Sequence, residues 1–158
     1  MNGRSGGVYV GALGVESAAR TLFAALDLFP GARIELLGAE APRRRVRERM
    51  ARAAYLVLPD EWYDDAPRTL IEAFANSLPV IASGAGALAE LIEPGRNGLL
   101  FAPGSARELA RRLAWAEAFP ERMRQMGECA QADYQARFGT HWTYARLFGE
   151  RRRHARAL

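Results

Sequence analysis

The segment from Leu58 to Phe101 decides the fold and reads LPDEWYDDAPRTLIEAFANSLPVIASGAGALAELIEPGRNGLLF. It alternates short apolar runs, such as Val80 to Ala82 and Leu99 to Phe101, with longer segments of helical period. Pro67 is suited to the first turn of a helix, and Pro79 marks the entry to a strand. This alternation is typical of βα units built around a parallel sheet.

The same pattern continues on both sides of that segment. Upstream, apolar runs predict strands at 8–10, 34–37 and 55–58, and helical periods predict helices at 16–29 and 42–54. Helices are also expected at 67–76 and 87–92, and the chain is helical in period from Ser105, with breaks at Pro120 and Gly139. The predicted fold class is α/β, a Rossmann-like doubly wound parallel sheet of about five strands with a helical C-terminal region. Residues 1–7 are expected to form a flexible tail, and residues 8–158 one domain.

Composition narrows the class of protein. The 158 residues include 22 basic side chains, all arginine, and 18 acidic ones, a formal net charge of +4. One cysteine excludes an intrachain disulfide, and no apolar run reaches the roughly 18–20 residues that a transmembrane helix needs. The arginine runs at 43–52 and 151–156 lack the interleaved aromatic residues of single-strand nucleic-acid binders. We therefore expect no nucleic-acid partner and no transmembrane segment, in a cytoplasmic protein that could be peripheral at the membrane.

Two acidic residues carry the first chemical signal. Asp64 and Glu72 are eight positions apart, the first in a predicted loop and the second inside the following helix. In a strand-loop-helix unit this spacing lets both side chains face one ligand at the carboxyl end of the strand. A carboxylate there can accept the hydroxyls of a ribose, while free amides in the first helical turn attract a pyrophosphate.

At these residues the sequence resembles a known family. The matching positions are Asp64, 72–75, 79–83, Gly86, Glu90 and 97–101. In this order they resemble the C-terminal, donor-binding half of the retaining glycosyltransferases of the GT-B fold, in the group called glycosyltransferase family 4 (group 1). The resemblance implies a domain that binds a nucleoside-diphosphate sugar.

The resemblance assigns roles residue by residue. Glu72 matches the glutamate that holds the ribose, although an ordinary acid on a helix surface would look the same in sequence. Asp64 stands where a longer glutamate contacts the transferred sugar, and it could instead cap the helix. These two form the predicted catalytic set. The predicted nucleotide-binding set is Ala66, Pro67, Arg68, Thr69 and Leu70, with backbone amides toward the pyrophosphate, together with Ser83 and Gly86.

Two departures separate this chain from the pattern that it resembles. Ala12 and Ser17 stand where the family has an arginine and a lysine that neutralise the diphosphate. Arg4, Arg20 and Arg68 are candidate substitutes for them. Between Gly38 and Tyr55 one strand-helix unit is missing, which predicts a smaller sheet.

The expected function is donor binding in a retaining glycosyltransferase of the hexosyltransferase type. The resemblance implies that the acceptor is held by an N-terminal domain or a partner chain, so the isolated chain is expected to be inactive. No cofactor and no metal are expected, because the nucleotide sugar is the substrate. The alternative is a degenerate, non-catalytic domain of the same fold that binds nucleotides or other proteins.

Overall fold

A computed structural model describes residues 3–14, 19–59 and 66–138 of the chain. The strands are β1 (Gly7–Val10), β2 (Ile34–Leu37), β3 (Tyr55–Leu58), β4 (Val80–Ser83) and β5 (Gly98–Phe101). The helices are α1 (Ala19–Leu28), α2 (Arg43–Met50), α3 (Ala66–Ala75), α4 (Gly86–Leu91), α5 (Ala106–Ala118) and α6 (Pro120–Asp133), followed by one π-helical turn, η1 (Tyr134–Phe138).

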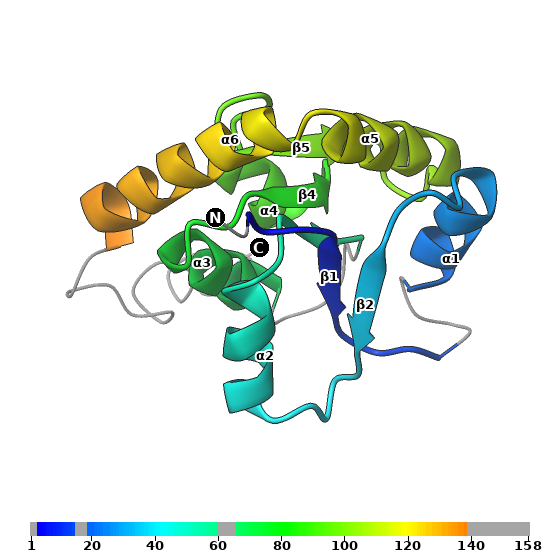
Figure 1. The fold of residues 1–158 in the computed structure, drawn as a ribbon, viewed down its shortest axis with the longest axis horizontal. Coiled ribbons are helices and arrows are strands. Elements are labelled where there is room, and N and C mark those ends of the chain that lie inside the picture. Colours follow the sequence, from blue (N-terminus) through cyan, green and yellow to red (C-terminus); the bar gives the residue numbers. More distant parts are fainter. Residues whose placement is uncertain (1–2, 15–18, 60–65, 139–158) are drawn as a thin grey trace, which may run out of the picture.

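The strands form one parallel sheet in the order β2-β1-β3-β4-β5 (Figure 1). The chain runs outward from β1 to β2 and then returns past β1 to β3. The order therefore reverses between β1 and β3, and the helices that follow these two strands, α1 and α3, cover opposite faces of the sheet. In open α/β sheets, ligands bind outside the carboxyl ends of the strands at such a point. The predicted α/β class with a five-stranded, Rossmann-like parallel sheet is confirmed.

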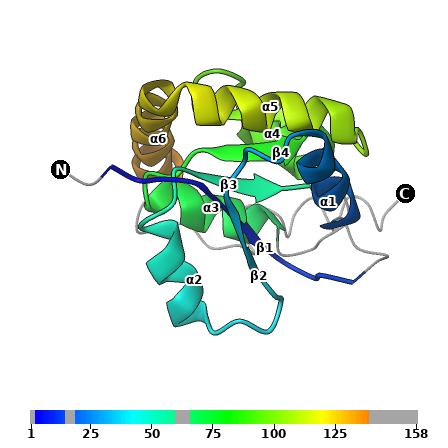
Figure 2. The same ribbon diagram turned by 45° about the vertical axis from the view of Figure 1, so that its right-hand side comes forward.

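Helices cover both faces of the sheet, so each face has its own core. On one face, Val8 and Leu56 pack with buried residues of α2, α3 and α4. On the other face, Tyr9 and Val57 pack with buried residues of α1, α5 and α6, and Figure 2 shows α1 beside α5. Successive residues of a strand point to opposite faces, which places neighbours such as Val8 and Tyr9 in different cores.

The central strands explain why the apolar runs were so continuous in sequence. Every residue of β3 and β4 is buried. Strands of a parallel sheet covered on both faces have no solvent side, so they lose the alternation of polar and apolar residues that an exposed sheet shows. The two central strands are therefore packed on both faces along their whole length, up to their carboxyl ends.

The N-terminal residues are tied to the sheet before the first predicted strand begins. The amide of Ser5 donates to the carbonyl of Arg52 at 3.2 Å, and the amide of Ala54 donates to the carbonyl of Gly6 at 2.7 Å. The amides of Ala51 and Ala53 still donate to carbonyls of α2, but the amide of Ala54 donates to Gly6 and not to a helical carbonyl. The chain has therefore left the helix before Ala54, where the sequence predicted its end. The division between a tail at 1–7 and a domain at 8–158 stays a prediction.

The C-terminal helices follow the predicted break. Helix α5 ends before Phe119, and α6 begins with Pro120 in its first turn. The π-helical turn after α6 was not expected, and Gly139 lies outside the described residues. None of the helices in the described ranges combines the length and the apolar character needed to cross a membrane.

Candidate functional site

The carboxyl edge of the sheet brings together most of the residues that the sequence singled out. Strand β2 leads into α2 through residues 38–42, and β4 leads into α4 through Gly84 and Ala85. Helix α3 also begins at this edge and runs back along the face of the sheet that α2 and α4 cover. Ligands of open α/β sheets bind at this edge, so polar groups that converge there are candidate ligand contacts.

Glu72 is the acidic centre of the site. Its side chain is 23% exposed and contacts two arginines, each about half exposed. Arg43 donates from Nη2 to Oε1 of Glu72, and Nε of Arg68 lies 3.5 Å from the same oxygen. We call these three residues the edge cluster. It joins the start of α2 to the outer side of α3 across 29 positions of sequence.

Local sequence explains how these three side chains meet. One side of α3 is buried through Leu70, Ile71 and Phe74. Arg68 and Glu72, four residues apart, are therefore neighbours on the outer side of the helix. On the neighbouring element, the amide of Ala41 donates to the carbonyl of Gly38 at 3.0 Å and closes the loop after β2. Pro42 then ends that loop, so Arg43 is the first residue of α2.

The first turn of α3 supplies backbone donors, but not all those predicted. The first four amides of a helix have no intrahelical acceptor, which makes a helix N-terminus suitable for a phosphate. Pro67 has no N–H, so it cannot donate as the sequence analysis supposed. Leu70 is fully buried and its amide lies one turn into the helix, where an intrahelical acceptor is in place. Thr69 is buried and makes an interaction of its own. The donors left in this first turn are therefore the amides of Ala66 and Arg68.

Ser83 and Gly86 lie at the end of β4 and the start of α4. Ser83 is fully buried, and its Oγ has no hydrogen-bond partner among the described residues. The next amide, that of Gly84, donates to the carbonyl of Phe101 at 2.8 Å and fixes the turn. Gly86 has φ +60°, a left-handed conformation that favours glycine. The turn thus has a fixed shape, and it holds an unpaired hydroxyl beneath it.

The loop after β1 is well supported but lacks the expected cation. Tyr9, which is buried, donates from its hydroxyl to the carbonyl of Ala12 at 2.6 Å. The amide of Gly11 donates to the carbonyl of Leu37 at 3.0 Å. Ala12 is exposed, so a methyl group stands where the resemblance implies an arginine. Ser17 and the predicted catalytic residue Asp64 lie outside the described residues.

Arg4 lies at the opposite edge of the sheet. Its Nη1 donates to the carbonyl of Ser77 at 3.2 Å, and it lines a cavity of about 610 Å³ together with Ala54 and Pro79, the residues just before β3 and β4. A side chain at the amino edge cannot reach a ligand at the carboxyl edge. Arg4 is therefore not the substitute cation that the sequence analysis considered.

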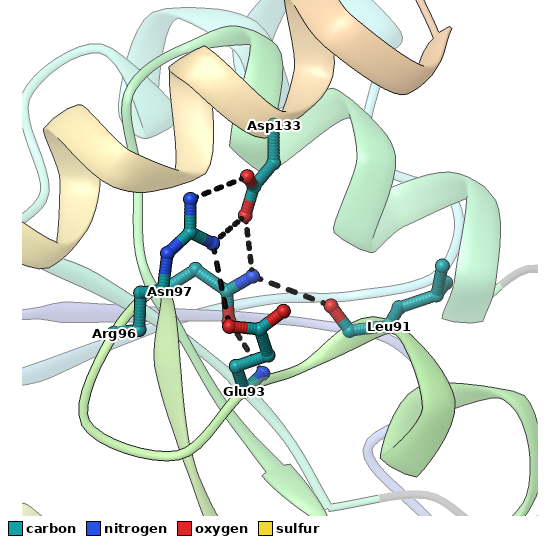
Figure 3. Close-up of polar contacts among 5 residues, drawn as sticks. All are labelled: Leu91, Glu93, Arg96, Asn97 and Asp133. Carbon is teal, nitrogen blue, oxygen red and sulfur yellow. Dashed lines mark hydrogen bonds and ion pairs between the residues drawn. The ribbon is translucent and has the colours of Figure 1, made fainter.

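A second charged cluster connects the turn before β5 to the end of α6 (Figure 3). Arg96 donates to both oxygens of Asp133, at 2.6 and 2.8 Å. Buried Asn97 donates to Asp133 at 2.8 Å and accepts the amide of Glu93 at 2.8 Å. We call Arg96, Asn97 and Asp133 the turn cluster. Hydrogen bonds from Arg96 and Asn97 hold the pKa of Asp133 below its ordinary value.

The turn cluster accounts for the Asn-Gly pair that the sequence resemblance included. The carboxamide of Asn97 makes hydrogen bonds to three groups. The next position requires glycine, because a Cβ on residue 98 would lie 2.3 Å from the carbonyl oxygen of Val80. This part of the motif is structural: it fixes how β5 enters the sheet.

No metal site was found in the described ranges. No group of three or more His, Cys, Asp or Glu side chains there could hold a metal ion. Among the described residues, the polar groups placed at the carboxyl edge above include the carboxylate of Glu72, the guanidinium groups of Arg43 and Arg68, backbone amides and the hydroxyl of Ser83. Such a set suits a ligand that carries both hydroxyl and phosphate groups.

The five-stranded sheet and its helices define the fold of the C-terminal domain of GT-B glycosyltransferases. The chain belongs to the family described as glycosyl transferases group 1, whose model matches residues 8–133. The C-terminal domain of the group 1 family protein LpcC from Francisella tularensis has a TM-score of 0.68 and 16% identity; the match covers 85% of this chain and 87% of that one.

Longer proteins match as well. The Anabaena protein Alr3699/HepE, solved in complex with UDP and glucose, has a TM-score of 0.72 and 20% identity, and the match covers 99% of this chain and 49% of that one. Exopolysaccharide phosphotransferase SCO2592 of Streptomyces coelicolor is 34% identical over 61% of this chain and 10% of its own length. Sulfoquinovosyl transferase SQD2 of Arabidopsis thaliana is 26% identical over 67% of this chain and 25% of its own. The chain thus spans a quarter or less of the curated relatives that it matches.

Arg43 is the site residue that sequence reasoning missed. In the sequence it is one of the arginines in the run at 43–52, which was considered only as a nucleic-acid site and set aside. Its distinguishing signal was its position directly after Pro42, where the chain leaves the carboxyl edge of the sheet. The pairing with Glu72 is tertiary, so no helical period could reveal it.

Proposed function

We propose that this chain is the donor-binding domain of a retaining glycosyltransferase of the family 4 type. It binds a nucleoside-diphosphate sugar at the carboxyl edge of its sheet, and the acceptor is held by an N-terminal domain or a partner chain. The observation that carries the proposal is the position of Glu72, on the outer side of α3 and within two turns of the N-terminus of that helix.

Each described group has a role in this proposal. The carboxylate of Glu72 accepts hydrogen bonds from the two hydroxyls of the ribose, and the amides of Ala66 and Arg68 face the pyrophosphate. The hydroxyl of Ser83 and the turn at Gly86 lie on the nucleotide side, and Asp64 is the proposed contact to the transferred sugar. The Anabaena protein of the same fold was solved with UDP and glucose, which supports a nucleotide sugar as the ligand class.

Calorimetric titration of the chain with UDP, GDP and ADP tests the proposal. We expect one of the three to bind, and Glu72→Ala to weaken that binding by about 10- to 100-fold, because a charged acceptor of hydroxyl groups is lost. Glu48→Ala is the matched control: Glu48 is an exposed acid on α2 that pairs with Arg44 within the helix. Equal losses in the two variants, or no binding to any of the three, would contradict the proposal.

One observation favours a second candidate, a non-catalytic relative that keeps the fold to bind nucleotides or proteins. The loop after β1 is held in place by Tyr9, yet it presents Ala12 in place of a cation. Loss of a preorganised donor to a developing anion costs about 2.7–4 kcal/mol of transition-state stabilisation. Strong nucleotide binding with no sugar transfer, even when an acceptor-binding domain is supplied, would favour this second candidate.

A further inference from the structure

The edge cluster holds more positive than negative charge. Two guanidinium groups, those of Arg43 and Arg68, share the single carboxylate of Glu72, which leaves a net charge of +1. Arg68 is also in the first turn of α3, where the free amides add partial positive charge. The edge cluster therefore attracts an anion, although its central residue is an acid.

The two arginines can leave Glu72 at small cost. Arg43 is 51% exposed and Arg68 53% exposed, and ion pairs at such exposure contribute little to stability. A guanidinium group bonds to a phosphate through two parallel N–H groups, which is a stronger contact than an exposed pair with a carboxylate. A phosphate group bound beside Glu72 therefore competes well for both side chains.

We infer that Arg43 and Arg68 are the cations that receive the diphosphate of the donor, in place of the arginine and lysine missing at Ala12 and Ser17. This inference rests on the proposed function. Before the ligand binds, Glu72 holds both guanidinium groups at the edge of the sheet. When the ribose hydroxyls bond to the carboxylate of Glu72, both arginines bond to the diphosphate instead. One ligand then provides partners for all three side chains.

Arg43 and Arg68 reach this position from different elements. Arg68 belongs to α3, the helix whose first amides face the pyrophosphate in the proposed function. Arg43 is the first residue of α2 and reaches Glu72 from there. The cations implied by the resemblance would come from the loop after β1 instead. The proposed cations therefore lie on the helices that follow β2 and β3, and not on the loop that follows β1.

The experiment compares a nucleoside diphosphate with its own nucleoside. The diphosphate is the one of UDP, GDP and ADP that binds best, and both ligands are titrated calorimetrically into the unmodified chain and the variants. Arg43→Gln is expected to weaken diphosphate binding by about 10- to 100-fold and nucleoside binding by less than about twofold. Arg68→Gln is expected to act in the same direction, and Arg43→Lys to recover part of the loss. Arg44→Gln is the matched control, since Arg44 is the adjacent residue of α2 and pairs with Glu48.

The outcomes separate the inference from the proposed function. If Arg43→Gln weakens both ligands equally, the residue only supports the fold of the site and the inference is wrong. The inference is also wrong if Arg20→Gln alone produces the selective loss. If the unmodified chain binds none of the three diphosphates, the proposed function itself fails. A melting temperature of each variant within about 2 °C of the parent shows that binding was compared between folded proteins.

Discussion

The edge cluster and the turn cluster are both built from a carboxylate and arginine, yet they differ in how the carboxylate is used. Asp133 is 15% exposed and accepts bonds at both oxygens from Arg96, with a further bond from Asn97. Glu72 is contacted by two arginines at one oxygen, Oε1. A carboxylate whose acceptor sites are filled by the protein stabilises the fold. One that is shared by exposed, displaceable partners is available to a ligand.

The largest expected effect is on stability at the turn cluster. Asp133→Ala removes the acceptor of Arg96 and of buried Asn97, so we expect a loss of about 2–4 kcal/mol in the free energy of unfolding. Chemical denaturation measures it. Glu72→Ala, measured in the same way, is expected to cost less than about 1 kcal/mol. Similar values for the two variants would remove the distinction between the clusters.

A pair of double-mutant cycles sharpens the comparison. We expect a coupling energy of about 1–2 kcal/mol between Arg96 and Asp133, because their contact is bidentate. The coupling between Arg43 and Glu72 is expected to be about 0.2–1 kcal/mol, as for other exposed pairs. A larger coupling at the edge cluster would mean that the arginine is too firmly held to transfer to a ligand.

The smallest expected effect is on how the free energy of unfolding depends on pH in the acid range. The pKa of Asp133 is lowered in the folded state, so its contribution to stability is present above the ordinary value of 3.8 and is lost as pH falls through the folded value. Asp133→Asn is therefore expected to flatten the decline of unfolding free energy below about pH 4. Urea titrations at a series of acid pH values measure this slope. An unchanged slope would show that Asp133 is not held as its contacts indicate.

Much of the fold could be predicted because its signals are local. The apolar runs of β3 and β4, the proline before β4 and the proline that opens α6 each act within a few residues. The errors arose where distant segments bond to each other. Helix α2 does not reach Ala54, because the carbonyl of Arg52 and the amide of Ala54 bond to Ser5 and Gly6, which lie more than forty positions away. The π-helical turn after α6 likewise has no local signal in the sequence.

The candidate site was predictable to the extent that it followed a motif. Glu72 and the start of α3 were singled out from their spacing and from the family resemblance, since the motif lies within one strand-loop-helix unit. Arg43 was not, because six arginines lie between residues 43 and 52 and no rule of spacing distinguishes the one that reaches α3. Pro67 shows a simpler limit: a helix start was recognised correctly, but one of its residues has no amide to offer.

The hydrogen bond between Tyr9 and Ala12 has a consequence for the engineering of the site. Tyr9 bonds to the main-chain carbonyl of residue 12 and not to its side chain, so the loop keeps its shape whatever residue stands there. The side chain of residue 12 is exposed and can change without disturbing the core. A single substitution, Ala12→Arg, would therefore place a charged side chain on a backbone segment that Tyr9 already holds.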